Sequence, residues 1–234
     1  MTDQLNKILK ELKAMEDQSC VEGMARYGIR SEKCYGVSMT KLMAIKRRVG
    51  KDHELADGLW KSGIHDARLL ACLIDDPKQV TETQMDRWVK DFDNWAICDG
   101  CCGHLFDKTP FAYRKARDWT RRKEEYVKRA GFVLVATLTV HDKKADDDAF
   151  LVFLPSILEA STDERNYVMK AVNWALRQIG KRNPRLNKEA IRVAERMRMS
   201  DSKSAKWIAS DALRELKSDP VRARFERMKG RSLH

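Results

Sequence analysis

Hydrophobic residues recur at spacings of three and four along almost the whole chain, which is the period of an amphipathic α-helix. Only 11 Gly and 5 Pro interrupt this pattern. Segments in which polar and apolar residues alternate, as they do in strands, are almost absent. The pattern predicts an all-α protein with helices at residues 3–18, 20–28, 38–49, 52–61, 64–75, 81–92, 94–106, 110–119, 123–139, 147–160, 163–180, 187–199, 202–217 and 220–230.

The connections between these helices are short, and no Ser/Gly-rich linker marks a domain boundary, so we expect one domain over residues 1–234. Ser38 and Thr81 stand where N-caps are expected. Helix pairs that repeat at roughly 35–45 residues predict an α-solenoid of HEAT-like antiparallel pairs with a concave basic face. Because the repeats are not obvious as sequence self-similarity, a compact helical bundle is the alternative.

The charge of the chain favours a polyanionic partner. Lys and Arg number 46 against 35 Asp and Glu, a net charge of +11. Residues 114–129 hold eight basic and three acidic residues, and residues 177–198 hold eight and two. Two such segments suit a groove that follows phosphates, so nucleic acid is the first expected partner and an anionic membrane surface the second. Ordinary solvated charge is the alternative for each segment.

No apolar signal core is present in the first residues, and no run of about 20 apolar residues occurs anywhere. We therefore expect a soluble, cytoplasmic protein that does not insert into a membrane, with its cysteines reduced.

Three of the six cysteines lie within residues 94–102. Cys98, Cys101 and His104 offer three metal ligands, whereas a structural zinc site takes four, usually as two separated pairs. The remaining cysteines supply no second close pair. We expect no metal here and interpret the thiols as buried helical residues that pack as small hydrophobic groups.

The same segment holds Trp95 and Asp99, one helical turn apart. At 100° per residue, Ile97, Cys101 and Leu105 define the core side of this helix, and Trp95 and Asp99 lie at roughly 160° and 200° from Ile97. An indole and a carboxylate thus share the side away from the core. An ordinary packing tryptophan is the alternative.

A second tryptophan shows the same anomaly. Trp174 lies roughly 200° from the core residue Val172, beside Tyr167, Lys170 and Arg177. An aromatic ring flanked by cations suits a surface that faces DNA.

Arg129 stands in a helix that is apolar nearly all round, with Tyr126, Val133 and Ala136 as neighbours in angle. A guanidinium in such surroundings needs a carboxylate or phosphate partner, unless it extends to an exposed edge.

Together these residues give a sequence that resembles the DNA alkylation repair family of HEAT-like DNA glycosylases, the AlkD-like enzymes. The matching stretches follow the family order from about residue 25 to 200 and are ARY (25–27), GVSMTKL (36–42), LW to HDARLLA (59–71), NWAICD (94–99), VKRAGF (127–132) and KAVNWALRQIGKRNP (170–184). The resemblance implies a catalytic role for Asp99, Trp95 and Trp174. It further implies DNA contacts by Tyr27, Ser38, Arg129, Tyr167 and Arg177.

Two positions depart from the family pattern. Asn94 stands before the first tryptophan, where relatives often carry an aromatic residue, and Asn166 stands before Tyr167 in the same way. These departures bear on the strength of DNA contact more than on the chemistry.

The implied activity is hydrolysis of the N-glycosidic bond of N3- or N7-alkylated purines in duplex DNA. Such a base is already a cationic leaving group, so one carboxylate that stabilises an oxocarbenium-like sugar and directs water is sufficient. We expect no cofactor, no obligate protein partner and a monomer. A DNA- or RNA-binding solenoid without activity and a protein-binding HEAT scaffold are the alternatives.

Overall fold

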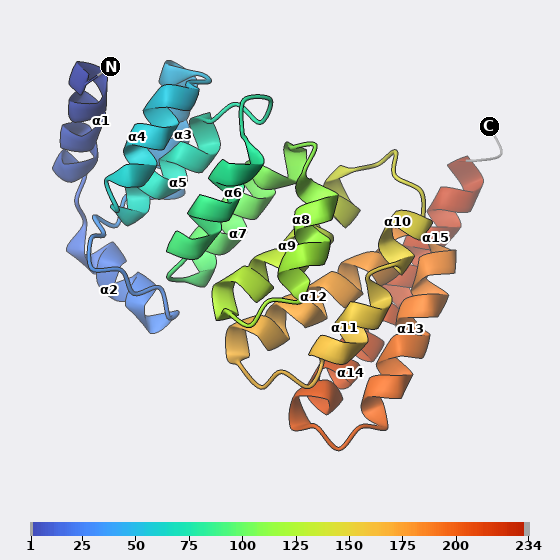
Figure 1. Ribbon diagram of the computed structural model, residues 1–234. Coiled ribbons are helices and arrows are strands. Elements are labelled where there is room, and N and C mark those ends of the chain that lie inside the picture. Colours follow the sequence, from blue (N-terminus) through green and yellow to red (C-terminus); the bar gives the residue numbers. More distant parts are fainter. Residues whose placement is uncertain (1, 232–234) are drawn as a thin grey trace. The chain divides into compact units, whose positions relative to one another are not determined.

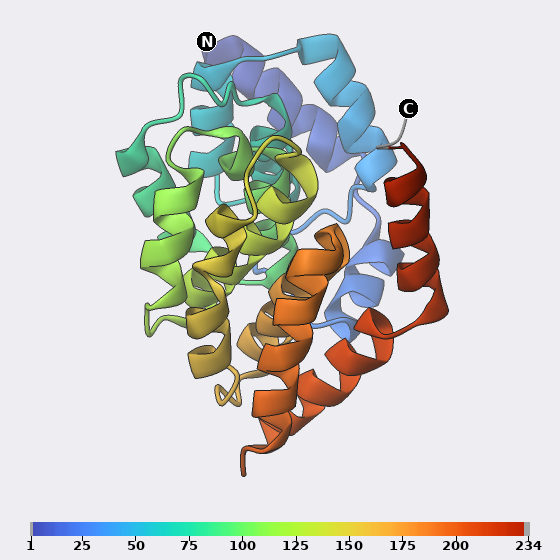
Figure 2. The same ribbon diagram turned by 90° about the vertical axis from the view of Figure 1, so that its right-hand side faces the viewer.

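The computed structural model describes residues 2–231, and within that range every regular element is a helix (Figure 1 and Figure 2). The all-α prediction is therefore confirmed. The helices form two compact units, residues 1–112 and 113–234. The expectation of a single domain stays a prediction, as does the concave basic face. Within the described residues, no helix combines the length and apolar character needed to cross a lipid bilayer.

The first unit is organised around α5 (His65–Ile74), which contacts four other helices of the unit. Eight of its residues are buried, because helices pack on it from several sides. Its neighbours are α1 (Thr2–Ala14), α3 (Met39–Val49), α4 (His53–Lys61) and α7 (Trp95–His104), and the unit is completed by α2 (Gln18–Arg26), α6 (Glu82–Trp88) and the 3-10 turns η1 (Val89–Asp91) and η2 (Phe106–Lys108). Trp60 and Trp88 stack at 4.0 Å between ring centroids and fill the core beside α6.

The second unit centres on the contact between α9 (Glu125–His141) and α12 (Asn166–Arg182). Twelve residues of α9 are buried, which agrees with its apolar character on all sides. The other helices are α8 (Ala112–Thr120), α10 (Asp148–Leu151), α11 (Leu154–Ala160), α13 (Pro184–Arg198), α14 (Lys203–Leu216) and α15 (Asp219–Arg231). Short links join α12 to α13 and α13 to α14, and these successive helices pack on one another.

Helix boundaries differ from the sequence prediction where local chemistry was misjudged. The predicted helix 147–160 is two helices, with Pro155 in the first turn of α11, where its missing N–H removes no helical hydrogen bond. Helix α13 begins at Pro184 rather than at residue 187, because Asn183 is its N-cap and accepts from the Leu186 amide at 2.9 Å. The predicted helix 81–92 ends in the turn η1.

Candidate active site and nucleic-acid interface

Helix α7 begins with a buried cap. The Asn94 side-chain oxygen accepts hydrogen bonds from the amides of Ala96 and Ile97, at 3.0 and 3.1 Å. Its Nδ2 donates to Asp93 at 2.6 Å and lies 3.3 Å from Nδ1 of His65. Burial lowers the pKa of His65, so the imidazole is neutral near pH 7 and this nitrogen can accept. Asn94 thus fixes the start of α7 from a buried position.

Trp95 and Asp99 are half-buried, whereas Ile97, Cys98 and Cys101 on the remaining sides of α7 are completely buried. The prediction that the indole and the carboxylate share the side away from the core is confirmed. The accessible side of α7 also includes the small residues Ala96, Gly100 and Gly103 and, at the helix end, the exposed His104. The Trp95 ring and the Asp99 carboxylate at its start are a combination that can stabilise a cation.

The Trp95 indole is held by a backbone contact from the start of the unit. Its Nε1 donates to the carbonyl oxygen of Tyr27 at 2.9 Å. Tyr27 itself is 77% exposed. The structure thus brings together two residues that the sequence placed on one interface, and the Tyr27 side chain stays available for a ligand.

The segment between α2 and α3 is fixed by α5. The Asp66 carboxylate is buried and accepts from the amides of Tyr35 and Val37, at 2.6 and 2.7 Å. Ser38 then begins α3 as an exposed N-cap residue whose side chain makes no capping bond. Its hydroxyl can therefore meet a phosphate beside the free amides of the helix N-terminus.

In the second unit, Arg129 is 5% exposed and donates from Nη1 to the Tyr167 carbonyl oxygen at 2.6 Å. The Tyr126 and Tyr167 rings lie 5.7 Å apart at 30°. Arg129 thus joins α9 to the start of α12 and has little surface of its own. Its predicted DNA contact stays a prediction, and the sequence did not reveal that a backbone carbonyl is one of its partners.

Trp174 is half-buried on α12, and the neighbouring Lys170 is exposed. Arg177 is bound to two carboxylates of α14, Glu215 and Asp211, the latter at 3.0 Å. The hydrogen bond to Glu215 raises the pKa of Arg177, which remains charged. Asp211 and Glu215 were missed, because nothing in the sequence of α14 indicates which helix it packs against.

Much of the positive charge predicted in residues 177–198 is paired within the unit. Besides the two pairs of Arg177, the ion pairs of this segment include Lys181–Glu215, Arg185–Asp147, Arg185–Asp148, Arg192–Glu189, Arg198–Glu195 and Lys217–Glu195. The exposed pairs among these are weak and can exchange partners. The segment is therefore less cationic than its composition indicates.

The cysteines of α7 pack as predicted: Cys98, Cys101 and Cys102 are completely buried together with Cys72 of α5. Burial raises the pKa of the Cys101 and Cys102 thiols well above the usual value, and neighbouring thiols raise it further. Among the described residues, no group of three or more metal-binding side chains occurs. Metal binding needs thiolates, which this environment disfavours.

The predicted residues fall into two groups that are each ordered by their own unit. Tyr27, Ser38, Trp95 and Asp99 belong to the first unit. Arg129, Tyr167, Trp174 and Arg177 belong to the second.

Comparison with known proteins agrees with the fold and identifies the family. A solved structure described as a new family of proteins related to the HEAT-like repeat DNA glycosylases, with affinity for branched DNA structures, matches with a TM-score of 0.76. The match covers 88% of this chain and 93% of that one at 19% identity, and it confirms a HEAT-like α-solenoid fold. No curated protein matches the sequence. The model of the DNA alkylation repair enzyme family matches residues 8–216, and the chain therefore belongs to that family.

Proposed function

We propose that this protein is a DNA glycosylase that removes N3- or N7-alkylated purines from duplex DNA by hydrolysing the N-glycosidic bond. The observation that carries the proposal is the pair Trp95 and Asp99, one turn apart on the side of α7 opposite its buried residues Ile97 and Cys101. An indole face and a carboxylate are the groups that a cationic sugar and a cationic base require.

In the proposed reaction, Asp99 stabilises the oxocarbenium-like sugar as the bond to the base breaks, and it orients the water that attacks the sugar. The alkylated purine leaves as a neutral base, so no general acid is needed. Trp95 offers its ring face to the developing positive charge, at roughly 0.5–2 kcal/mol. The hydrogen bond from Trp95 to the Tyr27 carbonyl fixes that ring before the substrate arrives.

The roles of Trp174 and Arg129 are carried over from the family motifs VKRAGF and KAVNWALRQIGKRNP. We expect Trp174 to offer an aromatic face and Arg129 to contact DNA. Arg129 also orders the start of α12 through its hydrogen bond to the Tyr167 carbonyl. Tyr27, Ser38, Tyr167 and Arg177 are the proposed contacts to the sugar–phosphate backbone. Because such contacts release counterions, log K for duplex binding should fall steeply with log salt.

The experiment is single-turnover release of N7-methylguanine from methylated duplex DNA, with duplex binding measured in parallel. Release by wild-type protein together with loss of release in Asp99→Asn supports the proposal. Equal rates for both proteins would show that Asp99 is not catalytic.

A non-catalytic DNA-binding protein is the second candidate, because the matched solved structure is described by its affinity for branched DNA. A four-way junction and a linear duplex of the same length distinguish the two candidates. Tight junction binding without base release from methylated duplex would favour the binding protein. Release from linear duplex favours the glycosylase, and no binding to either DNA would favour a protein-binding scaffold.

A further inference from the structure

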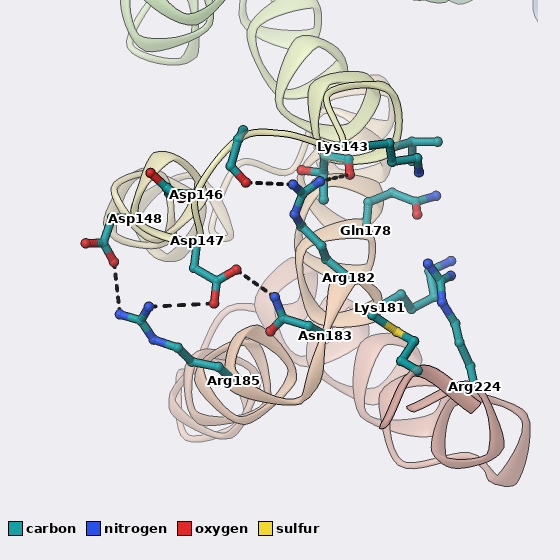
Figure 3. A pocket seen from close by; sticks show the side chains of 14 residues that line it. Lys143, Asp146, Asp147, Asp148, Gln178, Lys181, Arg182, Asn183, Arg185 and Arg224 are labelled. Carbon is teal, nitrogen blue, oxygen red and sulfur yellow. Dashed lines mark hydrogen bonds and ion pairs between the residues drawn. The ribbon is translucent and has the colours of Figure 1, made fainter. Parts of the chain in front are cut away.

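A polar pocket of about 940 Å³ lies within the second unit, where the C-terminal ends of α9 and α12 meet the starts of α10 and α13 and one side of α15 (Figure 3). Its α15 residues are Arg224 and Met228. The family match ends at residue 216, before α15 begins at Asp219. The pocket is thus completed by a helix outside the segment that defines the family.

Charge is unevenly distributed around the pocket. On one side, the Arg185 guanidinium pairs with both Asp147 and Asp148, at 3.6 and 2.9 Å, and Asn183 donates to Asp147 at 2.6 Å, so the acidic groups there are partly compensated. The side chains on the opposite side of the pocket are Lys143, Gln178, Lys181 and Arg224 (Figure 3). Five basic and three acidic residues line the pocket altogether, which leaves an excess of positive charge.

Several hydrogen-bond donors on the cationic side of the pocket are available to a ligand. Among residues 2–231, no hydrogen bond or ion pair engages the side chains of Lys143, Gln178 or Arg224. Lys181 bonds Glu215 at 2.9 Å and has two further N–H groups. Lys143 and Arg224 are exposed, while Gln178 is half-buried.

A further cation is fixed beneath these donors. The Arg182 guanidinium donates to the carbonyl oxygens of Thr139 and Ala145, at 2.8 and 2.7 Å, and lies 4.6 Å from the Phe150 ring centroid. These partners hold the guanidinium in place, and no carboxylate within the described part of the chain forms an ion pair with it. The pocket therefore has a rigid positive charge as well as flexible donors.

The pocket follows Trp174 along the same side of α12. Gln178 and Lys181 come four and seven residues after Trp174, so they lie on its side of the helix, about 6 and 10 Å further along the axis. Phosphates of one DNA strand are spaced by about 3.4 Å along the duplex axis. A strand that meets Trp174 and runs along α12 toward its C-terminal end would therefore reach this pocket within about three nucleotides.

We propose that the pocket binds one backbone phosphate of the damaged strand, with Arg224, Lys143 and Lys181 as its donors. The proposal rests on the proposed glycosylase function, because that function places a nucleotide at Trp174. It gives α15 a role that the family match does not cover, namely closing the phosphate site with Arg224.

The test compares Arg224→Ala with Arg227→Ala. Both arginines are exposed on α15, so the two substitutions remove the same charge. Only Arg224 lines the pocket, and Arg227 does not. We expect Arg224→Ala to weaken binding to methylated duplex by roughly 5- to 20-fold at low salt and to lower the slope of log K against log salt by about 1. Arg227→Ala should leave base release unchanged and affinity within about twofold.

A second measurement locates the contact on the DNA. Duplexes that carry one neutral methylphosphonate linkage, placed in turn at the three linkages on either side of the lesion, should lose affinity for wild-type protein at one position. Arg224→Ala should show no further loss at that position, because the contact is already gone. Equal losses in both proteins at every position would overturn the proposal.

A third arm uses inorganic phosphate as the competitor. If phosphate binds in an Arg224-dependent way while Arg224→Ala and Arg227→Ala bind duplex equally, the pocket takes a free phosphate and the strand proposal is overturned. If wild-type protein releases the base and the two variants bind duplex with equal affinity, the pocket proposal is overturned and the glycosylase proposal stands. An Arg224-specific loss of affinity without base release supports the pocket and refutes the glycosylase. No duplex binding by wild type overturns both.

Discussion

The indole Nε1 of Trp95 donates a hydrogen bond to the carbonyl oxygen of Tyr27, 68 positions earlier in the chain, at 2.9 Å. A single bond thus links the start of α7 to the exposed segment that follows α2. This hydrogen bond also orients the aromatic face of Trp95. A buried or half-buried tryptophan normally finds such a partner for its indole N–H.

This contact separates two contributions of Trp95. Trp95→Phe keeps an aromatic face and loses the hydrogen bond, which is worth about 0.5–1.5 kcal/mol, so we expect release of N7-methylguanine to slow by roughly 3- to 10-fold. Trp95→Ala loses the ring face as well and should slow release by roughly 10- to 100-fold. Single-turnover rates at saturating protein measure both. Equal rates for the two variants would mean that the aromatic face contributes nothing.

Asp99→Asn keeps the shape of the side chain and removes its charge. Loss of one preorganised electrostatic contact typically costs about 100- to 1,000-fold in rate, or roughly 3–4 kcal/mol. Because the carboxylate repels phosphates, the variant should bind duplex DNA as tightly as wild type or slightly more tightly. Base release and a binding titration on the same methylated duplex test both expectations. A parallel loss of affinity and rate would instead indicate a role in binding.

Asn94→Ala should destabilise the first unit by about 1–3 kcal/mol. The change removes the cap of α7, worth about 0.5–2 kcal/mol, and leaves His65 without its amide neighbour in a buried position. Urea denaturation followed by circular dichroism measures the free energy of unfolding. Asn166→Ala is the control, because Asn166 is exposed in the first turn of α12, and its effect should stay within about 0.5 kcal/mol. Similar values for the two variants would contradict the capping role.

Gly131→Ala should be strongly destabilising, by roughly 2–4 kcal/mol. A Cβ at Gly131 would lie 2.7 Å from the carbonyl carbon of Trp119 and closer still to the Thr120 amide nitrogen, so α9 would have to move away from the end of α8. Gly23→Ala is the matched control within a helix, because a Cβ there meets no atom within 4 Å. That change should stabilise by about 0.4–1 kcal/mol. Urea unfolding of both variants gives the comparison, and a neutral Gly131→Ala would contradict the close approach of the two helices.

The buried thiols should be unreactive in the folded protein. Ellman's reagent should modify Cys20, which is exposed, and react more slowly with Cys34, whose pKa burial raises to about 11. Cys72, Cys98, Cys101 and Cys102 should react only after denaturation. Elemental analysis of the purified protein should find no stoichiometric zinc. One equivalent of metal that is lost in Cys98→Ala or Cys101→Ala would reverse this interpretation.

The sequence by itself determined the helical class, most helix positions, and the side of α7 that carries Trp95 and Asp99. Hydrophobic periodicity encodes which side of each helix is buried, and cap residues encode where helices begin, so both are local properties that a single segment reveals. Where prediction failed, as at Pro155 and Asn183, the deciding chemistry was also local but was not recognised.

Only the tertiary structure decided which partners the site residues have. The bonds from Trp95 to the Tyr27 carbonyl, from Arg129 to the Tyr167 carbonyl and from Arg177 to Asp211 join distant parts of the chain. Backbone carbonyls carry no signature in the sequence, and a carboxylate on α14 is indistinguishable from any solvated one until the helices are packed. Charge can be counted from residues, but how much of it is cancelled depends on which helices meet.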